Sequence, residues 1–324
     1  MTFEKRVLVC GGAGFIGSNF LNHLVPKYPN YYFLCVDTLN YAANYENIKH
    51  LVESCKNFQF IKLDIGDPSL IEIVKEYQVN EIINFAAESC VDRSFENPYY
   101  FTKNNVLSTQ NLLEVCRMLP DQISFMIHNS TDEVYGDEDG DKDENSVLNP
   151  TNPYSATKGC MDLIINSYVY SYKLPITIIR PNNIYGPLQY PEKIISRTIK
   201  CIQDGTRMPI HGDGKCKRRY LYVSDLVNAI DLIWHEDRDK VVGEIFNVGS
   251  DDEPIDNNAV VKLVNEIFNE NGDAKVEHIK DRNYNDLDYS ILSTKIKQLG
   301  WKQEFSLKEG LNLYKMYVEA NKNK

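Results

Sequence analysis

The stretch Gly11-Gly12-Ala13-Gly14-Phe15-Ile16-Gly17 follows a short apolar run at residues 6–10 and precedes a sequence of helical character. Three of its glycines stand at the spacing that permits a tight turn, a close approach of the backbone to a ligand, and close packing of a helix on a strand: Gly11, Gly14 and Gly17. The amino end of such a helix offers free N–H groups to an anion. The stretch therefore predicts a strand, turn and helix that hold the pyrophosphate of a dinucleotide.

The alternation of strand and helix continues to about residue 180. Short apolar, β-branched runs recur between longer helical stretches, at residues 6–10, 31–36, 58–63, 81–86, 123–128 and 176–179. Because they are apolar throughout rather than at alternate positions, they suit the central strands of a parallel sheet covered on both faces. The predicted fold is α/β, a doubly wound parallel Rossmann sheet with a smaller C-terminal substrate-binding lobe.

Beyond residue 180 this rhythm breaks into mixed pieces. We expect a turn at Tyr185-Gly186-Pro187, a helix at 191–203, a strand at 219–223, helices from Ser224 and Ile255, and a final helix from Leu307. The predicted organisation is therefore a cofactor-binding Rossmann domain at residues 1–180, which also carries the catalytic residues, followed by residues 181–324, mostly a substrate-binding lobe.

The composition of the 324 residues is that of a globular protein, with 43% hydrophobic residues and a net charge of −11. Such a negative surface repels a polyanion, so we expect no nucleic-acid partner. No apolar stretch is long enough for a membrane span or a signal peptide, which predicts a cytoplasmic protein without a membrane partner. The eight cysteines are widely spaced, and no Cys-x-x-Cys or paired histidines suggest a metal site. We expect reduced thiols and no metal.

Asp37 ends the second predicted strand, twenty residues beyond Gly17. A carboxylate there can accept hydrogen bonds from the adenosine ribose and would repel a 2′-phosphate, and Thr38 and Leu39 offer no arginine to receive one. NAD is therefore favoured over NADP, although Asp37 could also be a turn acid at a strand end. The same position at strand ends or in the turns that follow makes further residues candidates for cofactor contact: Asn40, Asp64, Ile65, Ala86 and Ala87.

Chemistry is suggested by Thr131-Asp132-Glu133 after the fifth predicted strand, followed by Tyr154 and Lys158. Residues four apart lie on one face of a helix, and a lysine ammonium beside a phenol favours the phenolate. Adjacent carboxylates disfavour double ionisation, so one of the two acids should keep its proton near neutral pH. The alternatives are a solvated Tyr-Lys pair and a solvated acidic turn.

These motifs, together with Phe85-Ala86-Ala87-Glu88-Ser89, make the chain resemble the extended short-chain dehydrogenases/reductases. Three further stretches resemble the nucleotide-sugar 4,6-dehydratases of the dTDP-glucose and UDP-glucose type. They are Ala87-Glu88-Ser89-Cys90-Val91-Asp92-Arg93-Ser94, Ser130-Thr131-Asp132-Glu133-Val134-Tyr135-Gly136-Asp137, and Tyr185-Gly186-Pro187 through Pro191-Glu192-Lys193. The resemblance covers essentially the whole chain.

The resemblance implies roles for the catalytic candidates. Tyr154, held anionic by Lys158, would remove the proton of the sugar 4-hydroxyl as hydride leaves C4 for NAD. Glu133 would then take the C5 proton while protonated Asp132 donates to the departing 6-hydroxyl, and Thr131 would hydrogen-bond the oxygen at C4. Return of hydride to C6 would give a 4-keto-6-deoxy sugar.

The resemblance also implies a substrate site. Lys193, Arg218 and Arg282 match diphosphate-binding positions, and an arginine can bond two phosphate oxygens at once. Weaker matches are Asn183 and Asn285 for the nucleotide and sugar, and Glu88 and Ser89 for the hexose. Four positions depart from the family pattern and leave the shape of the substrate pocket open: Cys90, Asn104, Ile184 and Arg219.

The predicted activity is dehydration of a nucleotide-glucose by a hydro-lyase with bound NAD, in a rhamnose or other deoxysugar pathway. Residues 185–193 and His211-Gly212-Asp213-Gly214 resemble eukaryotic UDP-glucose dehydratases more than bacterial dTDP-glucose ones, and this resemblance favours UDP-glucose. A nucleotide-sugar 4-epimerase would use Tyr154 and Lys158 but would not need Asp132 and Glu133. A non-catalytic NAD-sensing regulator is the remaining alternative.

The resemblance further implies a homodimer joined by a four-helix bundle. Helices near residues 99–118 and 152–172 would each pair with their copy in a second subunit. Apolar residues around these helices support this, because they exceed what one sheet face could bury: Leu107, Leu112, Ile165 and Val169.

Overall fold

The computed structural model describes residues 3–137, 140–269, 272, 275–288 and 290–321. Its centre is a seven-stranded sheet in the order β11-β6-β5-β4-β1-β2-β3, with every neighbouring pair parallel. The strands are β1 (Lys5–Cys10), β2 (Tyr31–Asp37), β3 (Phe58–Lys62), β4 (Glu81–Asn84), β5 (Phe125–Asn129), β6 (Ile176–Pro181) and β11 (Ile245–Val248). The strand order reverses between β1 and β4, so the predicted doubly wound α/β fold is confirmed.

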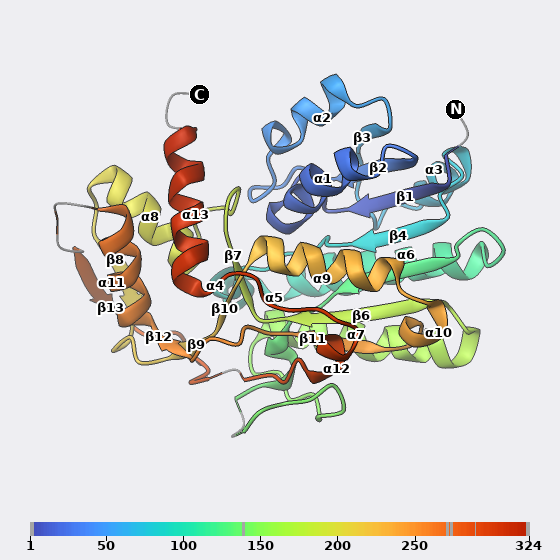
Figure 1. The fold of residues 1–324 in the computed structure, drawn as a ribbon. Helices are drawn as coiled ribbons and strands as arrows, with labels where there is room; N and C mark the ends of the chain where they lie inside the picture. Colours follow the sequence, from blue (N-terminus) through green and yellow to red (C-terminus); the bar gives the residue numbers. More distant parts are fainter. Residues whose placement is uncertain (1–2, 138–139, 270–271, 273–274, 289, 322–324) are drawn as a thin grey trace.

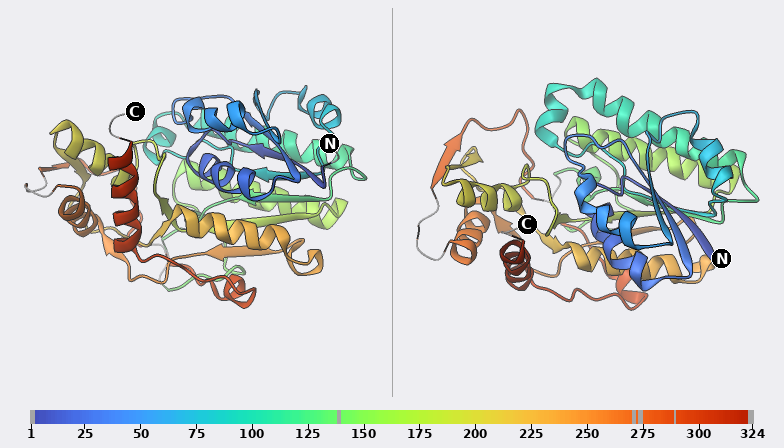
Figure 2. Two further views of the ribbon diagram at one scale, coloured as in Figure 1. Left: turned by 45° about the horizontal axis from the view of Figure 1, so that its top comes forward. Right: turned by 90° about the horizontal axis from the view of Figure 1, so that it is seen from above.

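Helices cover both faces of the sheet, as the right-hand view of Figure 2 shows. Successive strand residues point to opposite faces, so Val7 and Val9 of β1 join one hydrophobic cluster while Leu8 and Cys10 join the other. The first cluster includes buried residues of α1 (Phe15–Lys27), α2 (Lys49–Ser54) and α9 (Val223–His235). The second includes those of α3 (Leu70–Glu76), α6 (Ser108–Met118) and α7 (Pro153–Tyr172). Burial on both faces explains why the strand runs lack alternation.

Helix α7, which carries Tyr154 and Lys158, begins at a strong local signal. Asn152 accepts from the backbone N–H of Ser155 while the Ser155 side chain bonds back to Asn152, and Pro153 occupies the first turn. Such a capping box satisfies backbone donors that the helix cannot bond internally. Tyr154 is thereby held at the amino end of the helix. The remaining short helices of this part are η1 (Tyr45–Asn47), α4 (Val91–Glu96), α5 (Pro98–Phe101), the π-helical turn η2 (Thr102–Leu107), η3 (Asp132–Tyr135), α10 (Arg238–Val241) and α12 (Thr294–Gln298).

All six predicted strands overlap observed ones, but the sequence analysis missed the seventh, β11. This strand pairs with β6, and α9 packs on α1, so the sheet layer draws on residues well beyond 180. The predicted boundary at residue 180 therefore does not coincide with the edge of the sheet. The short run Ile245-Phe246-Asn247-Val248, which ends at Gly249, was the available signal.

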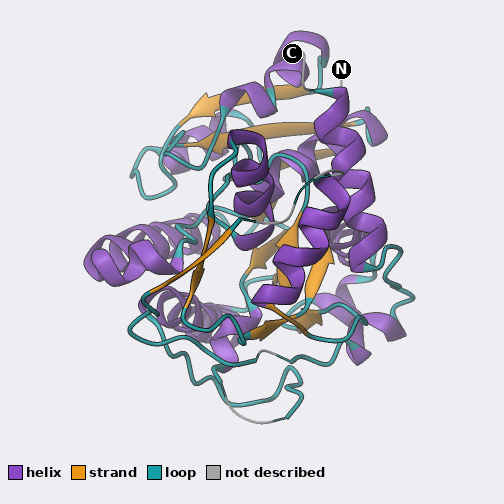
Figure 3. Ribbon diagram, turned by 90° about the vertical axis from the view of Figure 1, so that its left-hand side faces the viewer, coloured by secondary structure: helices purple, strands orange, loops and turns teal. Residues whose placement is uncertain are grey.

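A smaller lobe lies at the carboxyl ends of the parallel strands (Figure 1), and Figure 3 shows its helices in front of the sheet. Its strands form three two-stranded sheets: β7 (Asn183–Tyr185) with β10 (Tyr220–Tyr222), β9 (Lys217–Arg218) with β12 (Ile255–Asp256), and β8 (Met208–His211) with β13 (Val276–Ile279). Its helices are α8 (Ile194–Asp204), α11 (Asn257–Phe268) and α13 (Leu307–Ala320). A separate apolar cluster joins them to β7 and β10. Among the described helices, none combines the length and apolar character that crossing a membrane requires.

Candidate active site

A cavity lies at the carboxyl ends of the strands, and segments after β1, β2, β3, β4, β5 and β6 line it together with segments of the smaller lobe. Its centre is the point where the strand order reverses, which is where open α/β sheets bind ligands. The cavity brings together every residue that the sequence assigned to cofactor, catalysis or substrate: Gly11, Gly14, Phe15, Ile16, Gly17, Asp37, Asn40, Asp64, Ile65, Ala86, Ala87, Glu88, Ser89, Thr131, Asp132, Glu133, Tyr154, Lys158, Asn183, Lys193, Arg218, Arg282 and Asn285.

The glycine turn after β1 leaves no room for side chains. Gly11 has a φ of +72°, and a Cβ placed there would lie 2.7 Å from the backbone nitrogen of Ala86. A Cβ on Gly17 would lie 2.4 Å from the carbonyl oxygen of Gly11. Helix α1 begins at Phe15, and its N-cap residue, Gly14, supplies no capping side chain, so N–H groups of the first turn are left for an anion. The turn fits a pyrophosphate.

Asp37, at the end of β2, both accepts hydrogen bonds from nearby backbone groups and lines the cavity. Its Oδ2 accepts from the backbone N–H of Ala13 at 3.0 Å and its Oδ1 accepts from that of Leu39 at 2.8 Å. Burial raises the pKa of this carboxyl, and the backbone donors oppose the rise. Asp37 is thus a turn acid that also lines the cavity, and each carboxylate oxygen has a further lone pair for a ribose hydroxyl.

Glu88, predicted at the hexose, is almost fully buried and bonded to protein groups. Its Oε1 accepts from Asn40 Nδ2 at 2.6 Å and from the Tyr100 hydroxyl at 3.1 Å. Burial raises the pKa of the Glu88 carboxyl. In the structure this residue holds the segment after β2 to the segment after β4, and Asn40 is the partner through which it does so.

Tyr154 and Lys158 are both buried. The Lys158 ammonium donates to the carbonyl oxygen of Asn129, at the end of β5, at 2.6 Å. Burial lowers the pKa of Lys158 to about 8, opposed by the charge of Asp162. Burial raises the pKa of Tyr154, and the charges of Glu133 and Asp132 add to the rise. Tyr154 can therefore become a phenolate only if the cavity holds positive charge in addition to that of Lys158.

Asp132 is buried, with 2% of its surface exposed, and its carboxyl has two partners. Asn182 Nδ2 donates to its Oδ2 at 2.7 Å, and the Thr131 hydroxyl donates to its Oδ1 at 3.2 Å. Burial raises the pKa of Asp132 to about 7 and the charge of Glu133 adds to it, while Asn182, Arg218 and Thr131 oppose the rise. The sequence attributed the retained proton to the adjacent carboxylate, but burial is the larger cause.

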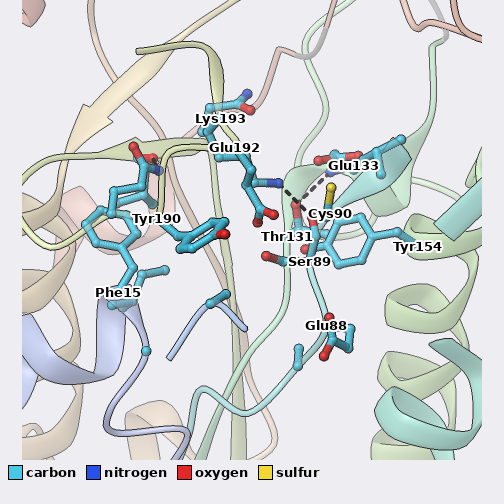
Figure 4. A pocket seen from close by; sticks show the side chains of 18 of the residues that line it. Phe15, Glu88, Ser89, Cys90, Thr131, Glu133, Tyr154, Tyr190, Glu192 and Lys193 are labelled. Carbon is cyan, nitrogen blue, oxygen red and sulfur yellow. Dashed lines mark hydrogen bonds between the residues drawn. The ribbon is translucent and has the colours of Figure 1, made fainter. Parts of the chain in front are cut away.

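Glu133 is the more exposed of the two acids. Its backbone N–H donates to Thr131 Oγ1 at 3.3 Å, and its Oε2 accepts from Asn152 Nδ2 at 3.4 Å. Figure 4 shows Thr131, Glu133 and Tyr154 grouped at one side of the pocket. A buried acid, a carboxylate and a phenol therefore lie around one space.

The three cations predicted for the diphosphate line the cavity, and each also bonds a protein group. Arg282 bonds both carboxylate oxygens of Asp92, at 2.6 and 3.0 Å. Lys193 Nζ donates to the carbonyl oxygen of Ser89 at 2.6 Å. Arg218 donates to backbone carbonyls, including that of Asp286 at 2.9 Å. The contacts of Arg282 and Lys193 join the smaller lobe to the segment that follows β4. The contact of Arg218 joins two segments of the smaller lobe.

The predicted nucleotide and sugar contacts differ in their partners. Asn285 donates from Nδ2 to Asp281 Oδ1 at 3.0 Å. The Nδ2 of Asn183 is buried and finds no hydrogen-bond acceptor within the described ranges. A buried amide donor without a partner is rare, and a bound ligand would supply one. Of the four departures from the family pattern, Cys90, Asn104 and Ile184 line the cavity, whereas Arg219 does not.

Sequence reasoning missed polar partners that hold the catalytic groups. They are Asn129, Asn152 and Asn182, which bond Lys158, Glu133 and Asp132. Their positions at two strand ends and at a helix start were available as signals. It also missed the Tyr41 hydroxyl, which donates to Glu192 Oε2 at 2.8 Å and joins the segment after β2 to the segment after β7.

A family model described as GDP-mannose 4,6 dehydratase matches residues 8–314, nearly the whole chain. The chain belongs to this family. It is 40% identical over 95% of its length to a trifunctional UDP-glucose 4,6-dehydratase/UDP-4-keto-6-deoxy-D-glucose 3,5-epimerase/UDP-4-keto-L-rhamnose-reductase of Arabidopsis thaliana, and spans 46% of that longer protein. The predicted membership of the nucleotide-sugar 4,6-dehydratases is confirmed.

Solved structures of dehydratases and of epimerases share the fold of this protein. A dTDP-glucose 4,6-dehydratase from Streptomyces venezuelae, solved with NAD bound, is 34% identical with a TM-score of 0.90, covering 98% of each chain. A UDP-glucuronic acid 4-epimerase from Bacillus cereus, in complex with UDP-glucuronic acid and NAD, is 26% identical with a TM-score of 0.89, covering 97% of this chain and 99% of the other. The fold thus accommodates both reactions, and the site must distinguish them.

Proposed function

We propose that this protein is an NAD-dependent nucleotide-glucose 4,6-dehydratase, a hydro-lyase. The observation that carries the proposal is Asp132, a buried carboxyl whose pKa is raised to about 7, which lies beside the more exposed Glu133 and lines the same cavity as Tyr154. Elimination of water needs an acid and a base together, and the environments of these two carboxyls supply one of each. A 4-epimerase needs only Tyr154 and Lys158.

NAD is the cofactor that the cavity fits. The glycine turn and the start of α1 would hold its pyrophosphate, Asp37 the adenosine ribose, and Asp64 and Ile65 the adenine. Bound NAD would accept the hydride from C4 and, once reduced, would return it to C6. Asp37 would repel the 2′-phosphate of NADP.

The residues of the chain move the protons. Tyr154, with Lys158 beside it, takes the proton of the 4-hydroxyl while C4 is oxidised, and Thr131 holds the oxygen at C4. The ketone makes the C5 hydrogen acidic, so Glu133 removes it as Asp132 protonates the departing 6-hydroxyl and water leaves. Glu133 then returns its proton to C5 as C6 is reduced, and the product is a 4-keto-6-deoxy sugar.

UDP-glucose is the proposed substrate, with dTDP-glucose as the competitor. The proposal is supported by the motifs at residues 185–193 and 211–214 and by the 40% identity to the Arabidopsis protein. In the smaller lobe, the substrate-binding part of our proposal, Lys193, Arg218 and Arg282 would bind the diphosphate. The product would enter a rhamnose or other deoxysugar pathway. Comparing kcat/KM for UDP-glucose and dTDP-glucose tests the preference.

Label transfer tests the reaction itself. UDP-glucose that is deuterated at C4 of the glucose should yield an alkali-sensitive 4-keto product. This product should carry the deuterium at C6 of the same molecule. Deuterium that stays at C4 of an inverted sugar would instead establish the epimerase, which the similarity to the Bacillus cereus enzyme makes the second candidate. Cofactor binding without any product would support an NAD-sensing regulator.

A homodimer through α6 and α7 remains our proposal for the assembly. The argument from sequence was wrong for two residues, because Leu112 and Ile165 are already buried within the monomer. Other large apolar residues on or beside these two adjacent helices are more than half exposed: Leu107, Met118, Leu163, Tyr170 and Tyr172. Such a surface suits a self-complementary interface. Light scattering at micromolar concentration should give twice the monomer mass of 37.3 kDa, and a monomeric mass would refute the dimer.

A further inference from the structure

A buried chain of hydrogen bonds connects the two elements that carry the catalytic candidates. Arg180 of β6 donates from Nε to Asp162 Oδ2 of α7 at 2.8 Å and from NH1 to the Tyr135 hydroxyl of η3 at 2.7 Å. That hydroxyl donates to Asn247 Oδ1 of β11 at 2.8 Å. All four residues are at most 2% exposed. Four elements are thus tied together out of contact with solvent.

Two members of this hydrogen-bond chain, Asp162 and Tyr135, lie close in sequence to the proposed catalytic groups. Asp162 is one helical turn beyond Lys158, and Tyr135 is in the same turn of four residues as Asp132 and Glu133. Arg180 stands one residue beyond Ile179, which is opposite Asn129 in the β5–β6 ladder, and the Asn129 carbonyl accepts from Lys158. The arginine is therefore placed between the helix and the turn at the level of the site.

We propose that Arg180 is a positioning residue that holds the Tyr154–Lys158 helix and the Asp132–Glu133 turn in one relative geometry, and that Asp162, its ion-pair partner one helical turn from Lys158, also favours the ammonium form of Lys158. The inference rests on the proposed function. Guanidinium geometry suits this role, because its planar fork can bond a carboxylate and a hydroxyl in fixed directions at once. Dehydration needs this geometry more than oxidation does, because acid, base and redox tyrosine must act on one sugar.

The electrostatics agree with this geometry. Burial raises the pKa of Tyr135 to about 12, so its hydroxyl keeps the proton that it donates to Asn247. The second oxygen of Asp162, Oδ1, is buried and has no hydrogen-bond partner within the described residues. Asp162 is ion-paired with Arg180, and beside the larger effect of burial its charge raises the pKa values of both Lys158 and Tyr154.

The turn side of the link is tested by Tyr135→Phe, which removes only the hydroxyl. We expect dehydration to slow by about 10- to 100-fold, as for a small misplacement of catalytic groups. The fraction of reduced cofactor on the enzyme should rise during turnover, while KM and NAD content stay at wild-type values. The matched control is Tyr32→Phe, which removes a hydroxyl bonded to Gln59 between β2 and β3.

Wild-type dehydration by Tyr135→Phe, or an equal loss in Tyr32→Phe, would overturn the role of the link. Parallel assays of the unmutated enzyme keep this outcome separate from a failure of the proposed function, which would appear as no 4-keto product from the wild type. Variants that remove Arg180 or Asp162 break a buried ion pair, which costs about 3–5 kcal/mol of stability, so their melting temperature is measured beside the rate.

The helix side is tested by Asp162→Asn through the pH dependence of the reduction of bound NAD on addition of UDP-glucose. This half-reaction is shared by dehydratases and epimerases, so it reports on Asp162 whichever reaction follows. Removing the negative charge should lower the pKa values of both Lys158 and Tyr154. The charged and titratable groups beside the Tyr154–Lys158 pair are Asp132, Glu133, His128 and Lys193, and Arg180 is bonded to Asp162 itself.

Because the half-reaction needs phenolate at Tyr154 and ammonium at Lys158, both limbs of the pH profile should move to lower pH in Asp162→Asn. A merely structural role would lower the rate or the melting temperature without moving the limbs. Unmoved limbs, or limbs that move to higher pH, would overturn the assignment of Asp162. A Glu72→Gln variant, on the exposed side of α3, should leave the profile in place.

Discussion

The two sides of the cavity that we propose for the cofactor and for the substrate engage their polar groups differently. On the cofactor side, backbone groups at strand ends form the surface, and Asp37 is fixed by two backbone donors. On the substrate side, the cations come from the smaller lobe and also bond protein acceptors, as the paired Arg282 and Asp92 show. The difference teaches that the cofactor side is preorganised by the sheet. The cations of the proposed substrate side would bind a ligand only by sharing or exchanging existing contacts.

The largest effect should come from the proposed catalytic residues, which lie between these two sides. Glu133→Gln keeps the size of the side chain and removes its basicity, so C4 is still oxidised but the C5 proton stays in place. Loss of a positioned general base costs about 10²- to 10⁴-fold in rate. Enzyme-bound NADH should therefore accumulate after UDP-glucose is added, and its absorbance measures the amount. Dehydration at the wild-type rate would return the site to the epimerase reading.

On the preorganised side, Asp37→Ala should weaken NAD binding by about 100-fold, because hydrogen bonds to a charged group contribute about 1.5–3 kcal/mol. The native enzyme should retain NAD through purification, since the proposed cycle ends with oxidised cofactor, and the variant should lose it. Isothermal titration with NAD measures the change. Retention of NAD by the variant would show that the glycine turn alone holds the cofactor.

On the exchanging side, Arg282→Ala should raise KM for the sugar nucleotide by only about tenfold, because contacts with the diphosphate replace part of an existing pair with Asp92. NAD content should not change. Arg282→Lys keeps the charge but loses the fork, so an intermediate KM is expected. Arg207→Ala, an exposed position elsewhere in the lobe, is the control. A loss as large as that of Asp37→Ala would remove the contrast between the two sides.

The smallest effect concerns pH. Dehydration needs Asp132 protonated, and its pKa is raised to about 7, so the proton is present below that pH and is lost as pH rises through it. The rate of the elimination step should fall by about fivefold between pH 7 and pH 8 from this group alone. Stopped-flow decay of bound NADH across this range measures it. Asp132→Asn should lack this limb, and a limb that persists in the variant would belong to another group.

Local features of the sequence predicted much of the fold and the cofactor and catalytic candidates, whereas the family resemblance implied the substrate-side residues that meet in the cavity. The glycine turn at Gly11, the strand runs and the capped helix with Tyr154 and Lys158 depend on contacts within a few residues, which spacing alone describes. The strand that was missed, Ile245–Val248, is short and pairs with a segment more than sixty residues earlier. No local pattern specifies such a partner.

The sequence by itself determined the residue types, their spacing along each element and thus the class of chemistry that they can perform. Only the tertiary structure decided that Asn182 bonds Asp132, that Arg180 joins α7 to η3, and that Arg282 pairs with Asp92 across 190 residues. It also decided that burial, more than the neighbouring carboxylate, keeps a proton on Asp132. The physical reason is that desolvation and long-range pairing depend on which distant segments pack together and exclude water, and this is a property of the folded chain as a whole.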